Sequence, residues 1–324
     1  MTGIQDIAKK AGVSVSTVSY ALNGSSKVTE KTRARILKIA REFNYSPNLA
    51  GRALKNQKSN IIGLYISDFG GYFYNNMLDG VNQVLRENHY ETLVATGGTH
   101  TRELITQGLV DGAIVLDPTF PDEVITQYAS QGKPIVVMDR KLTGPNIHQV
   151  LLDNETGAAQ AISSLYETQI DYFILVTGPN DSHDSNERMQ AALNAIKKFG
   201  DKQVVIVPSD FTIEGGRKAA ETISKMTLDS VGIFALNDET AVGLIDELPK
   251  FGVELPKDVK IIGFDNDILG SYLQPQLTTI DYSKHHWGQV AAQTLLEMIK
   301  NKDNAADHLV RTHIVHRQSL GENN

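Results

Sequence analysis

Polar residues follow the apolar runs of this sequence in a repeated pattern, and their side chains are of the types that bind hydroxyl groups. Carboxylates accept hydrogen bonds, and amides both donate and accept them, so several such side chains facing one crevice can bridge the neighbouring hydroxyls of a small sugar. Turns and helix caps are the alternative for any single Asp or Asn, because both residue types are common there. The polar groups in question are Ser67-Asp68, Asp117, Asp139-Arg140, Asn237-Asp238 and Asp265-Asn266-Asp267.

Three aromatic residues, Tyr72, Phe73 and Phe211, are candidates to cover the apolar face of such a ligand. Core packing is the alternative for Phe73 and Phe211. The segment 181–184 holds two acids and one His on a predicted loop, which is too few ligands to predict a metal site. The chain contains no Cys, which excludes disulfides and zinc–thiolate sites. We therefore predict a binding site that uses neither a metal nor a cofactor.

A second kind of chemistry is predicted at the beginning of the sequence. Apolar residues at helical spacing indicate a helix over about residues 4–11. Gly12 supplies a turn after it, and Ser14 is placed to cap a second helix. This is the layout of a helix-turn-helix, in which the first residues of the second helix enter the major groove of DNA. Those residues are Val15, Ser16 and Thr17.

Charge is distributed unevenly along the chain. Residues 1–59 contain eleven Lys and Arg and three acids, a net charge of +8, whereas the whole chain carries −7, so the remainder carries −15. A basic segment on an acidic body is expected when only that segment contacts nucleic-acid phosphates. A solvated helical face is the alternative, but it is more typical of mixed charges than of a one-sided excess.

Two more short elements are predicted in the basic segment. Thr29 can cap a third helix, whose apolar residues recur at i, i+3, i+4 and i+7 from Ile36. Ser46-Pro47 can start a fourth helix of about two turns. Because this helix is short and contains Gly51, we expect it to form only when something packs against it.

Residues 1–58 resemble the headpiece of the lactose-repressor/galactose-repressor family of bacterial transcription regulators, and the resemblance continues through nearly the whole chain. The motifs that carry it are Asp6-Ile7-Ala8, Ala11-Gly12-Val13-Ser14, Thr17-Val18-Ser19, Leu22-Asn23, Tyr45-Ser46-Pro47-Asn48 and Arg52-Ala53-Leu54. By position, the resemblance implies base contacts from Val15, Ser16 and Tyr20 and a minor-groove wedge from Leu54. Gly51 departs from the more usual Ala of the hinge helix. We expect contacts to the DNA backbone from Thr17, Asn23, Lys31, Arg33 and Lys55.

From Asn60 onward, apolar runs alternate with helix-length segments, which predicts an α/β body of doubly wound parallel sheets. The runs are 61–66, 113–116, 134–138, 173–176, 204–207, 232–236 and 261–264, and the helical segments are 74–88, 155–168, 186–198, 213–226 and 239–249. The resemblance implies two lobes, as in periplasmic sugar-binding proteins, with chain crossings near 155, 282 and 309. The segment 96–112 is shorter than is usual in the family, so its helix should have about two turns.

The expected domains follow from this division. They are an all-α helix-turn-helix headpiece (1–46), a hinge helix and linker (47–59), an N-terminal lobe (60–155 and 283–309) and a C-terminal lobe (156–282 and 310–324).

The resemblance also assigns positions in the ligand site, which in open α/β sheets lies beyond the carboxyl ends of the strands. Arg188 matches an arginine that reaches the effector, and Asp265 matches the aspartate of a Gly-Phe-Asp motif. An acid at position 184 favours a sugar over a purine, since purine-responsive relatives tend to carry basic or hydroxyl groups there. The remaining matched positions are Tyr72, Phe73, Asp139, Ser182, Asp184 and Asn237.

Together these features predict a repressor of a carbohydrate-utilisation operon, whose operator affinity is changed by a small sugar or sugar phosphate bound between two lobes. One headpiece buries too little surface for tight selective binding, so we expect a homodimer on a pseudo-palindromic double-stranded DNA operator. Neither a signal peptide nor a long apolar span is visible, which favours a cytoplasmic protein that makes no membrane contact. Two alternatives stay open: the same regulator responding to a purine or nucleoside, and a doubly wound enzyme with a DNA-binding head, for which no catalytic motif is visible.

Overall fold

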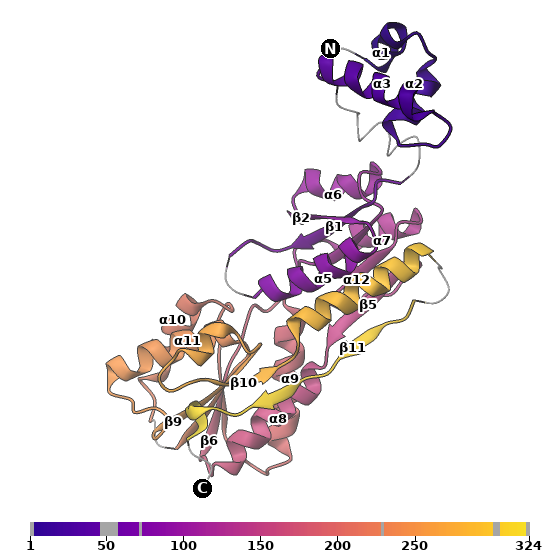
Figure 1. Ribbon diagram of the computed structural model, residues 1–324. Coiled ribbons are helices and arrows are strands. Elements are labelled where there is room, and N and C mark those ends of the chain that lie inside the picture. The colour runs from indigo at the N-terminus through magenta and orange to yellow at the C-terminus, as the bar shows by residue number, and fades with distance from the viewer. Residues whose placement is uncertain (1–2, 46–57, 71–72, 228–229, 301–304, 322–324) are drawn as a thin grey trace. The chain divides into compact units, whose positions relative to one another are not determined.

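The computed structural model describes residues 3–45, 58–70, 73–227, 230–300 and 305–321. The chain separates into two compact units, residues 1–59 and 60–324, which we call the head and the body (Figure 1). Each unit is described by itself.

The head is built from three short helices whose ends are set by local sequence signals. Gly12 ends the first helix with a left-handed backbone, at φ +64°. Ser14 caps the second by accepting the N–H of Thr17 at 3.1 Å, and Thr29 caps the third in the same way. The predicted helix-turn-helix and third helix are therefore confirmed. The helices are α1 (Ile4–Ala11), α2 (Val15–Leu22) and α3 (Glu30–Glu42).

The three head helices share one small apolar core. Ile7, Val18 and Ile36 are fully buried in it, one from each helix. Burying a side chain of this size contributes about 1.5–3 kcal/mol relative to leaving it exposed. These contacts fix the exposed face of α2.

The body contains two six-stranded sheets, each in its own lobe. The strand order is β11-β5-β4-β3-β1-β2 in the N-terminal lobe and β12-β10-β9-β8-β6-β7 in the C-terminal lobe. All described pairings are parallel except that of β12 with β10. The predicted fold class is confirmed. The strands are β1 (Ile61–Ile66), β2 (Glu91–Thr96), β3 (Gly112–Leu116), β4 (Ile135–Val137), β5 (Ile147–Leu152), β6 (Tyr172–Val176), β7 (Val204–Val207), β8 (Val231–Ala235), β9 (Val259–Phe264), β10 (Thr278–Asp281), β11 (His308–Val310) and β12 (His313–Val315).

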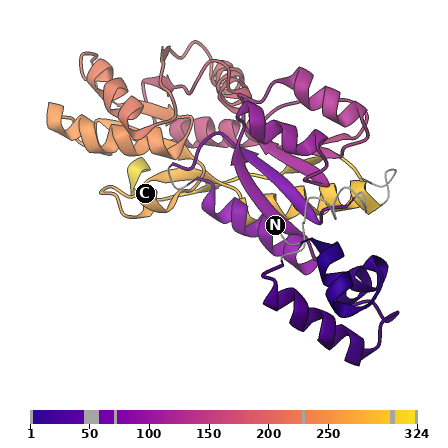
Figure 2. The same ribbon diagram turned by 90° about the horizontal axis from the view of Figure 1, so that it is seen from above.

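Helices cover the faces of both sheets, as the turned view shows (Figure 2). The helix α6 has eight residues, about two turns, as the short segment predicted. The helix that carries Arg188 starts at His183 and not at 186, because Ser182 caps it. None of the described helices is long and apolar enough to cross a membrane. The helices are α5 (Asn75–Glu87), α6 (Thr99–Thr106), α7 (Asp122–Ser130), α8 (Asn154–Glu167), α9 (His183–Lys197), α10 (Ile213–Ile223), α11 (Asp238–Glu247) and α12 (Lys284–Lys300), with short 3-10 helices η1 (Leu248–Phe251), η2 (Ile268–Ser271) and η3 (Gln318–Leu320).

The chain passes between the lobes three times, in the segments β5–α8, β10–α12 and β11–β12. After the second passage, α12 packs along α5 of the N-terminal lobe. Gly80 and Gly288 allow the close approach, because a Cβ on either would lie 2.0–2.2 Å from a carbonyl oxygen of the other helix. The start of α12, at Lys284, therefore lies where the two lobes meet.

Candidate functional site

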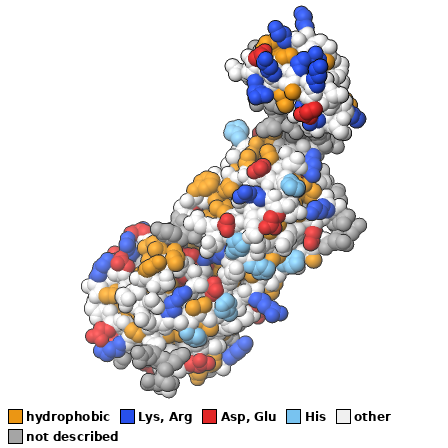
Figure 3. All heavy atoms as spheres, in the orientation of Figure 1, with side chains coloured by type: hydrophobic (Ala, Val, Ile, Leu, Met, Phe, Trp, Pro, Cys, Tyr) orange, Lys and Arg blue, Asp and Glu red, His pale blue; other side chains and the backbone are white. Residues whose placement is uncertain are grey.

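The exposed face of α2 carries the predicted base-reading residues. Val15 and Tyr20 are 42% and 40% exposed, although both are large and apolar or aromatic, and Ser16 is exposed beside them. The ammonium of Lys27 lies 5.1 Å from the centre of the Tyr20 ring. Lys and Arg side chains gather on the head in the space-filling view (Figure 3). An exposed side-chain row beside cations fits a surface for the major groove.

Arg33 has an internal role in addition to its predicted DNA contact. Its Nη2 donates to the carbonyl of Ser25 at 2.8 Å, and its Nη1 lies 3.1 Å from a carboxylate oxygen of Glu30. The side chain is largely shielded from solvent. Arg33 thereby ties α3 to the loop that follows α2.

The other residues predicted to contact the DNA backbone differ in their interactions within the head. Thr17 shares a hydrogen bond with Ser14 at 2.8 Å, and Asn23 ends α2. Lys31 is exposed. Leu54 and Lys55, with the predicted hinge helix, lie outside the described residues.

In the body, the predicted effector residues that the structure describes all lie in segments that follow the carboxyl end of a strand. Arg188 is the centre of the group and is only 3% exposed. Its Nε donates to Asn154 Oδ1 at 2.9 Å and its Nη1 to the carbonyl of Leu236 at 2.7 Å. Its Nη2 lies 3.6 Å from Asp265 Oδ1, and its guanidinium carbon lies 3.6 Å from the centre of the Phe264 ring.

Asp265 is buried against two cations. Its Oδ1 accepts the hydroxyl of Tyr282 at 2.9 Å, while Lys284 donates to its backbone carbonyl and, at 2.6 Å, to Asp267 Oδ1. Burial raises the pKa of Asp265 to about 6, although Arg188 and Lys284 oppose the rise. The site thus holds a buried carboxyl group whose pKa is about 6.

Lys284 connects this group to the predicted aromatic part of the site. Its ammonium lies 5.6 Å from the ring centres of both Phe73 and Tyr282. Trp287, fully buried, lies edge-on to both rings at 6.3 and 5.7 Å. Phe73 therefore packs partly in the core, which was the alternative to a ligand contact, and it also lies near Lys284 at the lobe junction. Tyr72 lies outside the described residues.

Asn237 and Phe211 are joined by a hydrogen bond. Asn237 Nδ2 donates to the carbonyl of Phe211 at 2.9 Å, while its Oδ1 caps α11 by accepting the N–H of Thr240. The Phe211 backbone has φ +67°, and its ring lies directly over Gly178, where a Cβ would be 2.3 Å away. Asn237 thus caps α11, binds the backbone of Phe211 and directly follows Leu236, whose carbonyl accepts a hydrogen bond from Arg188.

Asp184 and Asp139 belong to opposite lobes and are close enough for their charges to interact. Asn154 donates to Asp184 Oδ1 at 2.8 Å, and Arg140 donates to both oxygens of Asp139 at 2.9 Å. Burial raises the pKa of Asp139, Arg140 lowers it, and the negative charge of Asp184 raises it again. Ser182 lies apart from these contacts and caps α9.

A further ion pair crosses the lobe junction. Lys141 of the N-terminal lobe lies 2.5 Å from Glu187 of α9. Burial opposes ionisation of Glu187, but the hydrogen bonds from Lys141 and Asn154 outweigh it, and its pKa is lowered. Attraction at this pair and repulsion between Asp139 and Asp184 both depend on the angle between the lobes.

Sequence reasoning missed Asn154, Glu187, Tyr282 and Lys284. Asn154 follows the end of β5, and Tyr282 and Lys284 follow the end of β10. The rule that polar residues after a strand line the site would have found these three, had both strands been recognised. Glu187 lies in α9 between Asp184 and Arg188, both of which also bind Asn154, and only the fold reveals its partner Lys141.

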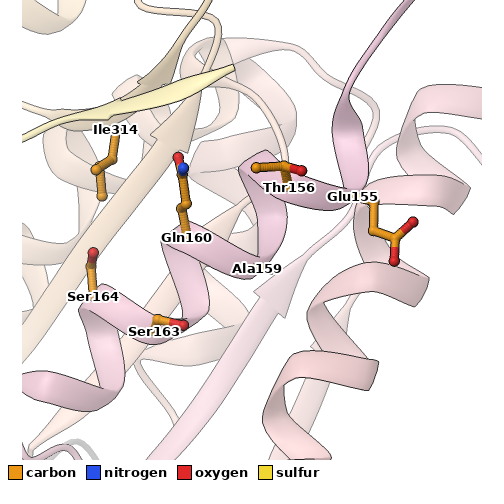
Figure 4. Close-up of a pocket in the computed structure, with 7 residues that line it drawn as sticks. All are labelled: Glu155, Thr156, Ala159, Gln160, Ser163, Ser164 and Ile314. Carbon is orange, nitrogen blue, oxygen red and sulfur yellow. The ribbon is translucent and has the colours of Figure 1, made fainter. Parts of the chain in front are cut away.

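An open pocket of about 460 Å³ lies elsewhere, between α8 and β12 (Figure 4). Its walls are mostly polar side chains of α8 and one residue of β12, and it contains none of the predicted effector residues. Within the described chain, no group of three or more His, Asp or Glu side chains is arranged to hold a metal ion. The lining residues are Glu155, Thr156, Ala159, Gln160, Ser163, Ser164 and Ile314.

Known proteins match both units of the chain. Residues 3–48 match the bacterial regulatory proteins of the lacI family, and residues 162–320 match the periplasmic binding protein-like domain. The chain is similar to the ribose operon repressor of Haemophilus influenzae, with 30% identity over 311 residues and 93% of each chain covered. The chain belongs to the LacI family.

Two other LacI-family proteins are similar to it. The transcriptional repressor PurR of Vibrio atlanticus is 29% identical and covers 94% of this chain and 93% of its own. The crystal structure of a sugar-binding LacI-family regulator from Enterococcus faecalis has 38% identity and a TM-score of 0.76, and covers 82% of this chain and 99% of its own. This LacI-family protein is a DNA-binding transcription regulator and not an enzyme.

Proposed function

We propose that this LacI-family protein represses a carbohydrate-utilisation operon and that a small sugar bound between its lobes changes its affinity for the operator. The observation that carries the proposal is the buried polar network around Arg188, which lies beyond the strand ends and reaches from α9 to the start of α12. Hydroxyl-rich ligands need such closely spaced donors and acceptors. The relatives described as a ribose operon repressor and as sugar-binding support the same class.

The proposed site consists of the residues predicted from the sequence. Arg188 and Asp265 contact the sugar directly, Asn237, Asp139 and Asp184 bind its hydroxyls, and the aromatic rings cover its apolar face. Ser182 is retained as a contact through its position at the start of α9. The aromatic members are Tyr72, Phe73 and Phe211.

On DNA, we propose a homodimer that binds a pseudo-palindromic operator in the cytoplasm. Val15, Ser16 and Tyr20 read bases, and Leu54 wedges between base pairs in the minor groove. The domain limits predicted from the sequence are part of this proposal. The backbone contacts are Thr17, Asn23, Lys31, Arg33 and Lys55.

A purine or nucleoside effector is the second candidate, because PurR is among the similar proteins. Both candidates are tested by selecting operator sites from random double-stranded DNA and measuring affinity with and without sugars and nucleobases. We expect a pseudo-palindromic site and an affinity that only sugars change. A response to nucleobases alone would replace the sugar by the purine, and a monomer that binds one half-site with full affinity in sedimentation would refute the dimer.

A further inference from the structure

Many charged side chains lie around the junction of the two lobes. We call the group formed by Asp139, Asp184, Glu187, Asp238, Asp265, Asp267, Arg140, Lys141, Arg188 and Lys284 the junction cluster. It contains six acids and four Lys or Arg, linked by the contacts described above and by Asp238, which accepts the backbone N–H of Asp267 at 2.7 Å.

Each cation of the junction cluster already faces a carboxylate. Arg140 binds Asp139 through two nitrogens, Lys141 binds Glu187, and Lys284 binds Asp267. Arg188 lies beside Asp265, but its hydrogen bonds at Nε and Nη1 occupy only two of the five N–H donors of a guanidinium. Arg188 can therefore give hydrogen bonds to a neutral oxygen, while its positive charge is already balanced.

The acids of the cluster, in contrast, exceed its cations. Burial and the neighbouring acids Asp267 and Asp265 raise the pKa of Asp238 well above its ordinary value, and the pKa of Asp139 is raised by burial and by Asp184. Burial is the larger cause of both shifts, and the neighbouring acids add to it, so a further negative charge would be unfavourable at either carboxylate. A phosphate or carboxylate brought into this junction would be repelled and would have to break an existing ion pair to find a cation.

We infer that the effector is a sugar without a phosphate or carboxylate group, bound through its hydroxyls and ring oxygen. The inference rests on the proposed function that a sugar binds between the lobes. A regulator with this selectivity responds to the sugar before any kinase phosphorylates it and before any dehydrogenase oxidises it to a uronate.

Matched pairs of ligands test the inference on the full-length protein. Isothermal titration calorimetry would compare ribose with ribose 5-phosphate, glucose with glucose 6-phosphate, and galactose with galacturonate. We expect a neutral sugar to bind and its acidic partner to bind at least about tenfold more weakly. Tighter binding of a phosphorylated or oxidised sugar would overturn the inference but leave a sugar effector in place. If a nucleobase binds and no sugar does, the proposed function fails together with the inference.

A variant separates charge from shape. Asp184→Asn keeps the size of the side chain and an oxygen to accept the hydrogen bond of Asn154, but removes one negative charge. It should narrow the difference in affinity between the neutral and acidic members of a pair. Glu221→Gln, an equal change of charge at an exposed position on α10, should leave that difference unchanged. The same difference in wild type and Asp184→Asn would show that the junction charge does not select the ligand.

Discussion

The pairing of Arg188 with Asp265 predicts a specific pattern of stability in single and double variants. Both side chains are almost fully buried, at 3% and 4% exposed. Arg188→Met keeps an unbranched apolar stem but leaves Asp265 without its guanidinium neighbour. Removing one partner of a buried ion pair costs about 3–5 kcal/mol, because the other charge stays buried. Adding Asp265→Asn removes that charge. The double variant should therefore lose about 1–3 kcal/mol less free energy of unfolding than the two single variants lose together.

Trp287 provides the assay. It is the only tryptophan in the chain and is fully buried, 5.7 Å from the Tyr282 ring that binds Asp265. Its fluorescence during urea unfolding of the full-length protein therefore reports on the body and not on the head. The free energy of unfolding at pH 7 is extrapolated to water for the four proteins of the cycle.

An exposed arginine is the control for this experiment. Arg217 of α10 is 43% exposed and has ion pairs with Glu214 and Asp246, so Arg217→Met should cost no more than about 1 kcal/mol. If Arg188→Met costs as little as this control, or if the losses in the double variant simply add, the two side chains are not energetically coupled and the central contact of the proposed site is wrong.

Three other predictions concern pH, DNA and helix packing. Because Asp265 has a pKa of about 6 when folded and 3.8 ordinarily, the folded state binds more protons between these values. Asp265 should therefore increase the free energy of unfolding as pH falls from 6 towards 4, and Asp265→Asn should lose that part of the pH dependence in urea titrations; an unchanged slope would contradict the raised pKa. Tyr20→Ala should change the preferred operator base by about 1–3 kcal/mol in competition binding, whereas an equal loss for all sequences would remove its base-reading role. Gly288→Ala should lower the melting temperature, since its Cβ would lie 2.2 Å from the carbonyl oxygen of Met77, and an unchanged value would show that α5 and α12 can separate at no cost.

The apolar runs of the sequence predicted seven of the described strands. The strands that they did not predict are β2, β5, β10, β11 and β12. Strands such as β3 and β8 are buried on both faces and appear as continuous apolar runs. The edge strand β2 is mostly half-exposed and includes polar residues, and β11 and β12 have three residues each. Such strands are defined by pairing with distant segments, as β11 pairs with β5. Periodicity within one segment cannot reveal them.

Part of the polar network in the body could be predicted where a local rule applied. Asp265 and Asn237 directly follow apolar runs, and the caps at Ser14 and Thr29 follow from residue type alone. Arg188 lies twelve residues after the end of β6, in α9, and was predicted only from the family resemblance. The partner of Arg188 at Asn154 and the pair of Lys141 with Glu187 join segments that are 34 and 46 residues apart. These contacts depend on how the two lobes meet, which no local pattern specifies.

A buried network of this kind is difficult to explain by stability alone. Well-packed apolar side chains of similar volume often stabilise a protein as much as a buried ion pair, or more. The junction cluster instead contains an attractive pair, Lys141 and Glu187, and a repulsive pair, Asp139 and Asp184, each with one member on either lobe. A ligand can change the angle between the lobes only if it binds one arrangement of them more tightly than the other. Shifting that equilibrium from 1:99 to 99:1 requires a difference of about 5.5 kcal/mol, which a few hydrogen bonds to buried charged groups can supply at about 1.5–3 kcal/mol each. The charged junction is therefore what we expect of a site that must couple a small ligand to the arrangement of two lobes.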